Sequence, residues 1–315
     1  MDRVVYDEFS MFGENASEFG LPFDAPPVVQ RVGVPVADGN ELSALIWGAE
    51  AASYVFLHGG GQNAHTWDTV ALALGKPLVA IDLPGHGHSF VPDVSVGISP
   101  PILADYVAEG IAQLTTKPIH LIGMSLGGLT SIGIAATHPE LVASLTLVDI
   151  TPGVKGAKTA AIGAFVNGPA TFPSFGELLA RTIEHNPTRT EASMRRGILH
   201  NAMQLDDGSW MWRYRRGGAA SPISGSPSAA ASSQGANEGI PNFTALWDQV
   251  ASLTMPVMLV RGMRSQSVID DDDEAELLRR QPSARIEHFV EAGHSVQGDM
   301  PVELAAVIAN FTNKS

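Results

Sequence analysis

Short apolar runs alternate with amphipathic stretches through the first half of the chain. The runs are each four residues long, and they lie at 54–57, 78–81, 119–122 and 145–148. Between them, apolar residues recur at helical spacing over 67–74, 102–114 and 129–137. Short buried strands that alternate with helices are typical of a parallel sheet whose crossover helices cover both of its faces.

Further strands are expected on either side of this region. Residues 28–36 and 42–47 have strand patterns and are joined by the turn Asp38-Gly39-Asn40, which is a hairpin signal. Near the C-terminus the patterns predict strands at 256–260 and 284–290 and helices at 243–253, 270–280 and 302–311.

The segment between these two halves has a different pattern. It contains helical stretches at 159–166, 175–185 and 191–204 and then an aromatic cluster of Trp210, Trp212 and Tyr214. Residues 217–239 are rich in Ser, Ala, Gly and Pro, which predicts a flexible loop. We therefore expect an α/β core formed by 28–153 and 246–315, an inserted helical cap at 154–245, and an N-terminal arm at 1–27 that lies on the surface.

Composition excludes several classes of function. The 315 residues carry a net charge of −14, from 33 acidic and 19 basic side chains, so neither nucleic acid nor an anionic membrane is an expected partner. The chain has no cysteine, which excludes disulfides, thiolate nucleophiles and cysteine-ligated metals. We find no signal-peptide pattern and no long apolar run, and we expect a cytoplasmic protein, monomeric or homodimeric, that acts on a small molecule.

The strand at 119–122 leads into Gly123-Met124-Ser125-Leu126-Gly127, and a helical pattern follows at once. Strand, Gly-x-Ser-x-Gly and helix form the layout of a nucleophile elbow. The glycines remove side chains that would collide at such a sharp turn. Ser125 would then lie at a helix N-terminus, where free N–H groups stabilise an oxyanion.

Other polar clusters also follow predicted strands. They are 59–62, 82–89 and Asp149, and the carboxyl ends of parallel strands are where α/β sheets bind ligands. A serine nucleophile needs a base, usually a histidine. Among ten histidines, His294 is favoured because it follows the last strand in the segment Glu291-Ala292-Gly293-His294-Ser295. His58 is expected to shape its loop, His86 and His88 to build a turn, and His120 to pack within its strand.

In the order of these motifs, the chain resembles the α/β-hydrolase superfamily over about residues 28–313. The resemblance is carried by His58-Gly59-Gly60, the segment 82–89, Gly123 to Gly128 and Gly293-His294. It implies a serine nucleophile, an acid and a histidine in that chain order. It also implies an oxyanion hole made by the N–H groups of Gly60 and Leu126, with no metal and no cofactor.

The acid departs from the common pattern of the superfamily. No carboxylate occupies the usual turn after the strand that follows the cap, because that segment reads Arg261-Gly262-Met263-Arg264-Ser265-Gln266-Ser267. A minority of the superfamily takes its acid from the strand end where Asp149 lies, and we favour Asp149. The cluster from Asp270 to Asp273 remains the alternative, although it has the pattern of a helix start.

The resemblance implies acyl transfer, and we expect a carboxylic ester hydrolase for a small hydrophobic ester. Carbon–carbon bond hydrolases and perhydrolase or haloperoxidase-like enzymes of the same fold remain open, as does a slow-turnover receptor or binding protein. Five residues are expected to contact substrate: His65, Trp67, Met124, Trp210 and Trp212. The alternative for the cap aromatics is that they hold the cap onto the sheet.

Overall fold

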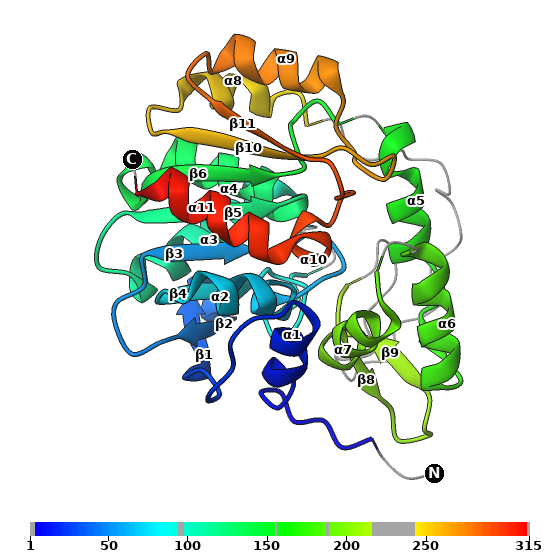
Figure 1. The fold of residues 1–315 in the computed structure, drawn as a ribbon. Coiled ribbons are helices and arrows are strands. Elements are labelled where there is room, and N and C mark those ends of the chain that lie inside the picture. The colour runs from blue at the N-terminus through cyan, green and yellow to red at the C-terminus, as the bar shows by residue number, and fades with distance from the viewer. Residues whose placement is uncertain (1–3, 94–97, 155, 187–188, 216–242, 314–315) are drawn as a thin grey trace.

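The computed structural model describes residues 4–93, 98–154, 156–186, 189–215 and 243–313. An eight-stranded sheet with helices on both faces forms the core, and a smaller cap packs beside one end of it (Figure 1). The expected flexible loop at 217–239 lies outside the described residues. None of the described helices is long and apolar enough to cross a membrane.

The main sheet has the strand order β1-β2-β4-β3-β5-β6-β10-β11. Its strands are β1 (Val29–Val36), β2 (Asn40–Trp47), β3 (Tyr54–Leu57), β4 (Leu78–Asp82), β5 (Ile119–Met124), β6 (Val142–Val148), β10 (Val257–Gly262) and β11 (Arg285–Phe289). The β1–β2 and β2–β4 pairs are antiparallel, and the remaining pairs are parallel. The predicted, mostly parallel sheet is therefore confirmed, with strand ends moved by a few residues.

Two apolar layers cover the sheet, because successive side chains of each strand point to opposite faces. In β3, Val55 and Leu57 enter one layer and Tyr54 and Phe56 the other. The first layer is completed by α3 (Pro100–Leu114), α4 (Leu126–Thr137), α8 (Leu246–Ser252) and α9 (Asp271–Arg280). The second is completed by α1 (Phe12–Glu18), α2 (Asp68–Leu74), α10 (Val296–Asp299) and α11 (Pro301–Thr312).

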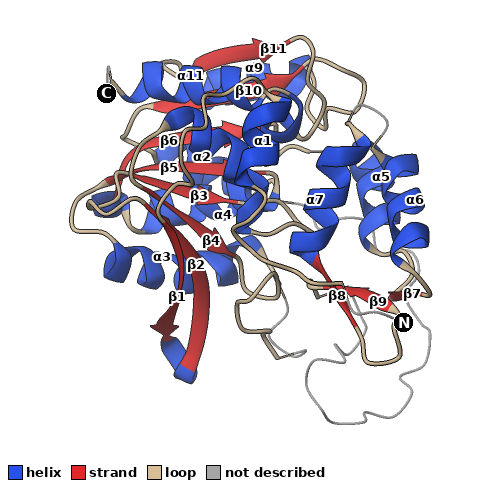
Figure 2. Ribbon diagram, turned by 60° about the horizontal axis from the view of Figure 1, so that its bottom comes forward, coloured by secondary structure: helices blue, strands red, loops and turns tan. Residues whose placement is uncertain are grey.

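The described part of the cap contains three short strands besides its helices, whereas the sequence pattern predicts helices alone as its regular elements. Its helices are α5 (Gly156–Val166), α6 (Phe175–His185) and α7 (Glu191–Asn201), and its small sheet has the order β7-β9-β8 (Figure 2). These strands are β7 (Thr171–Phe172), β8 (Ala202–Gln204) and β9 (Trp210–Trp212). The helix predicted to reach residue 204 ends at Asn201, because the chain then turns into β8 and pairs with β9.

The N-terminal segment is more than a surface arm, which corrects a second expectation. Phe12, on α1, is buried to 2% exposure and packs on Trp47 with ring centroids 4.9 Å apart. Before the helix, the Glu8 carboxylate pairs with the Arg31 guanidinium on β1. The segment therefore completes the apolar layer over one face of the sheet.

Candidate active site

The elbow forms where the sequence predicts it. Strand β5 ends at Met124 and helix α4 begins at Leu126, and Ser125 between them has φ 51° and ψ −118°. This strained backbone is held in place by close packing, because a Cβ at Gly123 would collide with the carbonyl of Gly127. A Cβ at Gly127 would likewise collide with the Leu57 carbonyl on the neighbouring strand. The sheet thus presents Ser125 at its carboxyl edge.

Asp149 and His294 are 145 residues apart in the sequence but lie within hydrogen-bond distance of each other. The His294 Nδ1 lies 2.9 Å from Asp149 Oδ2, and both side chains are buried. Asp149 follows β6 with φ 49°, and it also accepts the N–H groups of Gly262 and Val268 at 2.9 and 3.1 Å. The hydroxyl of Ser267 donates to Oδ1 at 2.7 Å. An acceptor that receives four donors is an ionised carboxylate held in one orientation.

This pairing sets the proton on the histidine ring. Because Asp149 accepts from Nδ1, that nitrogen carries the hydrogen and Nε2 keeps its lone pair. A histidine in this tautomer is ready to accept a proton at Nε2.

The alternative acids, Asp270 and Asp273, cap the N-terminus of helix α9. Asp270 is the N-cap of α9, and its carboxylate accepts the N–H of Asp273 at 3.1 Å. The Asp273 carboxylate returns a bond to the N–H of Asp270 at 3.0 Å, which makes a capping box. Lys158 pairs with Asp270 at 2.5 Å. His294 is therefore hydrogen-bonded to Asp149, whereas Asp270 and Asp273 bond to each other's N–H groups.

A cavity of about 530 Å³ opens over the elbow, and we call it the elbow cavity. Ser125, His294, Gly60, Leu126 and Met124 all line it. Most of its remaining wall near the elbow is apolar and comes from Leu129, Ile150, Val154, Ile162, Phe165, Val166 and Phe243. The nucleophile and the base predicted from sequence thus share one largely apolar cavity between core and cap.

The two residues that are expected to supply the oxyanion hole lie next to each other. Leu126 is the first residue of α4, so its N–H has no partner within the helix. A Cβ at Gly60 would lie 4.0 Å from Leu126 Cδ2, which places the two residues next to each other. His58 fixes the approaching loop, because Leu83 N–H donates to its Nε2 at 2.9 Å and its Nδ1 donates to the Gly59 carbonyl at 2.8 Å. Burial lowers the pKa of His58, which keeps the ring neutral.

Only part of the expected substrate contacts lie in the elbow cavity. Met124 lines it, but Trp67 is buried beneath the sheet and packs on Phe56 with ring centroids 5.0 Å apart. Trp210 packs on Phe175 inside the cap, with centroids 5.1 Å apart. These two placements correct the prediction, because strand β9 and the helix start at 68 turn both indoles into apolar clusters.

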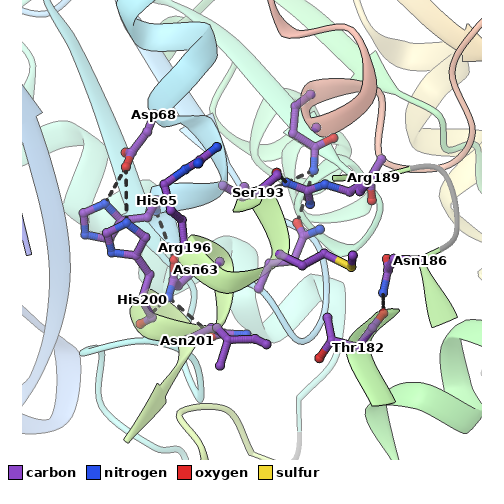
Figure 3. Close-up of a pocket in the computed structure, with 18 of the residues that line it drawn as sticks. Asn63, His65, Asp68, Thr182, Asn186, Arg189, Ser193, Arg196, His200 and Asn201 are labelled. Atoms are coloured by element: carbon purple, nitrogen blue, oxygen red, sulfur yellow. Dashed lines mark hydrogen bonds and ion pairs between the residues drawn. The ribbon is translucent and has the colours of Figure 1, made fainter. Parts of the chain in front are cut away.

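His65 and Trp212 line a second cavity of about 150 Å³, which we call the polar chamber (Figure 3). The chamber lies between the loop before α2 and helix α7 of the cap. It shares wall residues with the elbow cavity, among them Gln62, Asn186 and Arg189. Much of its wall is polar, in contrast to the elbow cavity.

His65 is fully engaged at one end of this chamber. Its Nδ1 lies 2.9 Å from Asp68 Oδ2 and its Nε2 lies 2.9 Å from Glu8 Oε1. Burial acts to lower the pKa of His65, but Asp68 and Glu8 outweigh it and raise that pKa to about 9. His200 stacks on His65 with centroids 3.8 Å apart, and burial and the His65 charge hold the pKa of His200 well below its usual value. His65 therefore ties the N-terminal segment to the core.

The trio of His65, Asp68 and His200 has ligand atoms within 4.8 Å of one another. Its geometry does not suit a metal ion, however. The two imidazole planes are stacked 3.8 Å apart and only 12° from parallel, so no point close to both nitrogens lies in both ring planes. Both nitrogens of His65 are also already occupied by carboxylates. We interpret the trio as a charge network that supports the fold.

This network predicts a loss of stability at alkaline pH. Because the pKa of His65 is about 9 in the folded chain against an ordinary histidine pKa of 6.5, its contribution to stability is complete below pH 6.5 and disappears as pH rises through 9. The shift corresponds to about 3 kcal/mol at most. Urea unfolding at pH 6.5, 8 and 10 should show this fall in wild type and a flatter profile in His65→Gln. His138→Gln supplies the control, because His138 is only partly buried and makes none of the contacts of this network. An equally steep fall of stability in His65→Gln would contradict the assignment.

Comparison with known proteins agrees with this geometry. The model of the alpha/beta hydrolase family matches residues 54–307. The chain belongs to this family. It is 41% identical over 310 residues to the esterase Rv0045c of Mycobacterium tuberculosis, a match that covers 96% of this chain and 94% of the relative. The predicted family and the mostly parallel sheet of its fold are thereby confirmed.

Two further similarities place this α/β hydrolase among its relatives. A crystal structure of the Mycobacterium tuberculosis esterase has a TM-score of 0.80 at 38% identity and covers 99% of this chain and 100% of that one. The 3-hydroxybutyrate-oligomer hydrolase of Cupriavidus necator is 27% identical over 84% of this chain and 91% of its own length. The family resemblance therefore spans nearly the whole hydrolase, cap included.

Sequence reasoning missed two features of the site. The first is Ser267, which lies in the turn after β10 that has no carboxylate of its own. Its hydroxyl and the N–H of Val268 donate to the Asp149 carboxylate. The absence of an acid in that turn was the available signal. The second is Arg189, which lines both cavities but lies between two cap helices where nothing in the pattern marks it.

Proposed function

We propose that this hydrolase cleaves carboxylic esters through an acyl intermediate on Ser125. The observation that carries the proposal is the bond of 2.9 Å between His294 Nδ1 and Asp149, with His294 and Ser125 in the wall of one cavity. The relative named an esterase, 41% identical over most of both chains, supports the same reaction class.

The residues have complementary roles in the proposed reaction. His294 Nε2 takes the hydroxyl proton of Ser125 while the oxygen attacks the ester carbonyl. The N–H groups of Gly60 and Leu126 hold the oxyanion, and Asp149 stabilises the imidazolium that forms. The imidazolium then returns its proton to the departing alcohol. Water, activated by His294, attacks the acyl-enzyme and releases the carboxylic acid and Ser125.

The shape of the elbow cavity favours an ester with an apolar part. Its volume of about 530 Å³ accommodates a small molecule, and Leu129, Ile162 and Val166 form part of an apolar wall. Met124 lies beside the nucleophile, so we propose it as a substrate contact. The Trp67 and Trp210 indoles do not line this cavity and have no role in the proposal.

We expect the purified hydrolase to turn over p-nitrophenyl acetate and butyrate and to be labelled at Ser125 by a fluorophosphonate. Loss of turnover in proportion to labelling would tie the activity to the elbow. Labelling without ester turnover would instead favour carbon–carbon bond hydrolysis. The absence of both labelling and turnover would favour a binding protein of this fold and would overturn the proposal.

A further inference from the structure

Arg189 occupies the boundary between the elbow cavity and the polar chamber. It lies between α6 and α7 and lines the polar chamber (Figure 3). It also belongs to the wall of the elbow cavity. Its Nη2 donates to the Ser193 hydroxyl at 2.5 Å, and its Nε is buried with no partner in the described part of the chain. Packing holds the side chain in place, because a Cβ at Gly298 would lie 3.0 Å from Cζ of Arg189.

The charge of Arg189 sets it apart from the other cations of these walls. Lys158 pairs with Asp270 at 2.5 Å, and Arg196 pairs with Glu18 on α1. Within the described residues, no carboxylate forms an ion pair with Arg189. Burial lowers the pKa of Arg189, while the more distant Asp299 and Glu18 act to raise it. Arg189 is partly buried, and an unpaired cation withdrawn from water is costly unless a partner of opposite charge joins it.

The groups around Arg189 include a further donor. Gln62 also lines both cavities, and its Oε1 already accepts the N–H of Gly59 at 3.1 Å, which leaves its NH₂ to donate. The Asp299 carboxylate is an acceptor in the elbow cavity, but it accepts the N–H of Gly293 at 2.8 Å. The boundary between the cavities thus offers a guanidinium and an amide donor beside a largely apolar acyl site.

We propose that Arg189 binds a carboxylate of the substrate, so that the preferred ester carries a negative charge at the end remote from the scissile bond. The inference rests on the proposed ester hydrolysis and adds the substrate class. A guanidinium forms two parallel hydrogen bonds with a carboxylate, which makes arginine well suited to bind this group. The chain has a net charge of −14, which repels an anionic ester, and a local cation offsets this repulsion at the site.

The test compares charged esters with neutral ones of the same shape. The substrates are the monomethyl esters of succinate, glutarate and adipate, each paired with the methyl ester whose far end is the uncharged carboxamide. Proton release in a pH-stat gives kcat/KM for each. We expect at least one acid to be preferred over its amide, and Arg189→Gln to lower this ratio by about 10- to 100-fold, as the loss of a charged hydrogen bond implies. Arg189→Lys should restore part of the ratio.

Arg195→Gln is the matched control, because it removes the same charge from an exposed position on the neighbouring helix α7, where Arg195 lies over the Phe175 ring. It should leave the ratio within about twofold of wild type. A wild-type enzyme that prefers the amides throughout, or an equal ratio in Arg189→Gln, would overturn the inference while ester hydrolysis stands. Failure to hydrolyse any ester, p-nitrophenyl acetate included, would instead count against the proposed function.

Discussion

Replacing Ser125 with alanine is expected to abolish ester hydrolysis while leaving the fold intact. The change removes one oxygen at the carboxyl edge of the sheet, and the α4 N-terminus, His294 and Asp149 remain in place. Without the nucleophile no acyl-enzyme forms, and the remaining oxyanion donors polarise the carbonyl only toward water. We expect kcat/KM for p-nitrophenyl butyrate to fall by roughly 10⁴-fold or more.

This experiment needs a measure of folding, because residue 125 has a strained φ of 51°. Alanine would have to keep the same φ. The thermal midpoint of Ser125→Ala should stay within a few degrees of wild type. Ser252→Ala, an equal truncation at an exposed serine on α8, should retain full activity. Residual activity within tenfold of wild type in Ser125→Ala would show that hydrolysis does not pass through this serine.

The core of this hydrolase could be predicted from sequence because its strands are short, buried and separated by regular helices. The β3 strand lies at the predicted residues, and the elbow follows β5 as its glycines require. The convergence of Ser125, Asp149 and His294 was predictable for a topological reason. In a parallel sheet, every strand delivers its carboxyl end to the same edge, so residues that follow β5, β6 and β11 become neighbours.

The cap and the N-terminal segment could not be predicted in the same way. Strands such as β8 and β9 are three residues long, which is too short to show a period of two. β9 also pairs with β7, which lies about 40 residues earlier in the chain, and local propensity yields to such contacts. The burial of Phe12 likewise depends on Trp47, which lies 35 residues further along the chain. Trp67 follows the oxyanion loop closely, but its direction is set by the turn into α2.

The sequence alone favours Asp149 over Asp270 only weakly. The different contacts of these two residues allow a direct test. Asp149→Asn should lower kcat by about 10³- to 10⁴-fold. Asn Oδ1 keeps the bonds from Gly262 N–H and the Ser267 hydroxyl, so its NH₂ group turns toward His294. The imidazole must then offer a lone pair at Nδ1 and carry its hydrogen on Nε2. In that tautomer the ring cannot accept the proton of Ser125.

Asp270→Asn is the matched control, since it makes the same change of charge at the cap of α9. Asn is also a good N-cap, so we expect stability to change by less than about 1 kcal/mol and activity to remain near wild type. In Asp149→Asn the NH₂ group replaces Oδ2, so Val268 N–H loses its acceptor, and unfolding should become easier by about 1–3 kcal/mol. Full activity in Asp149→Asn together with an inactive Asp270→Asn would move the acid to the start of α9. If Asp149 orients His294, only Asp149→Asn should lose activity. Its fluorophosphonate labelling of Ser125 should slow in parallel.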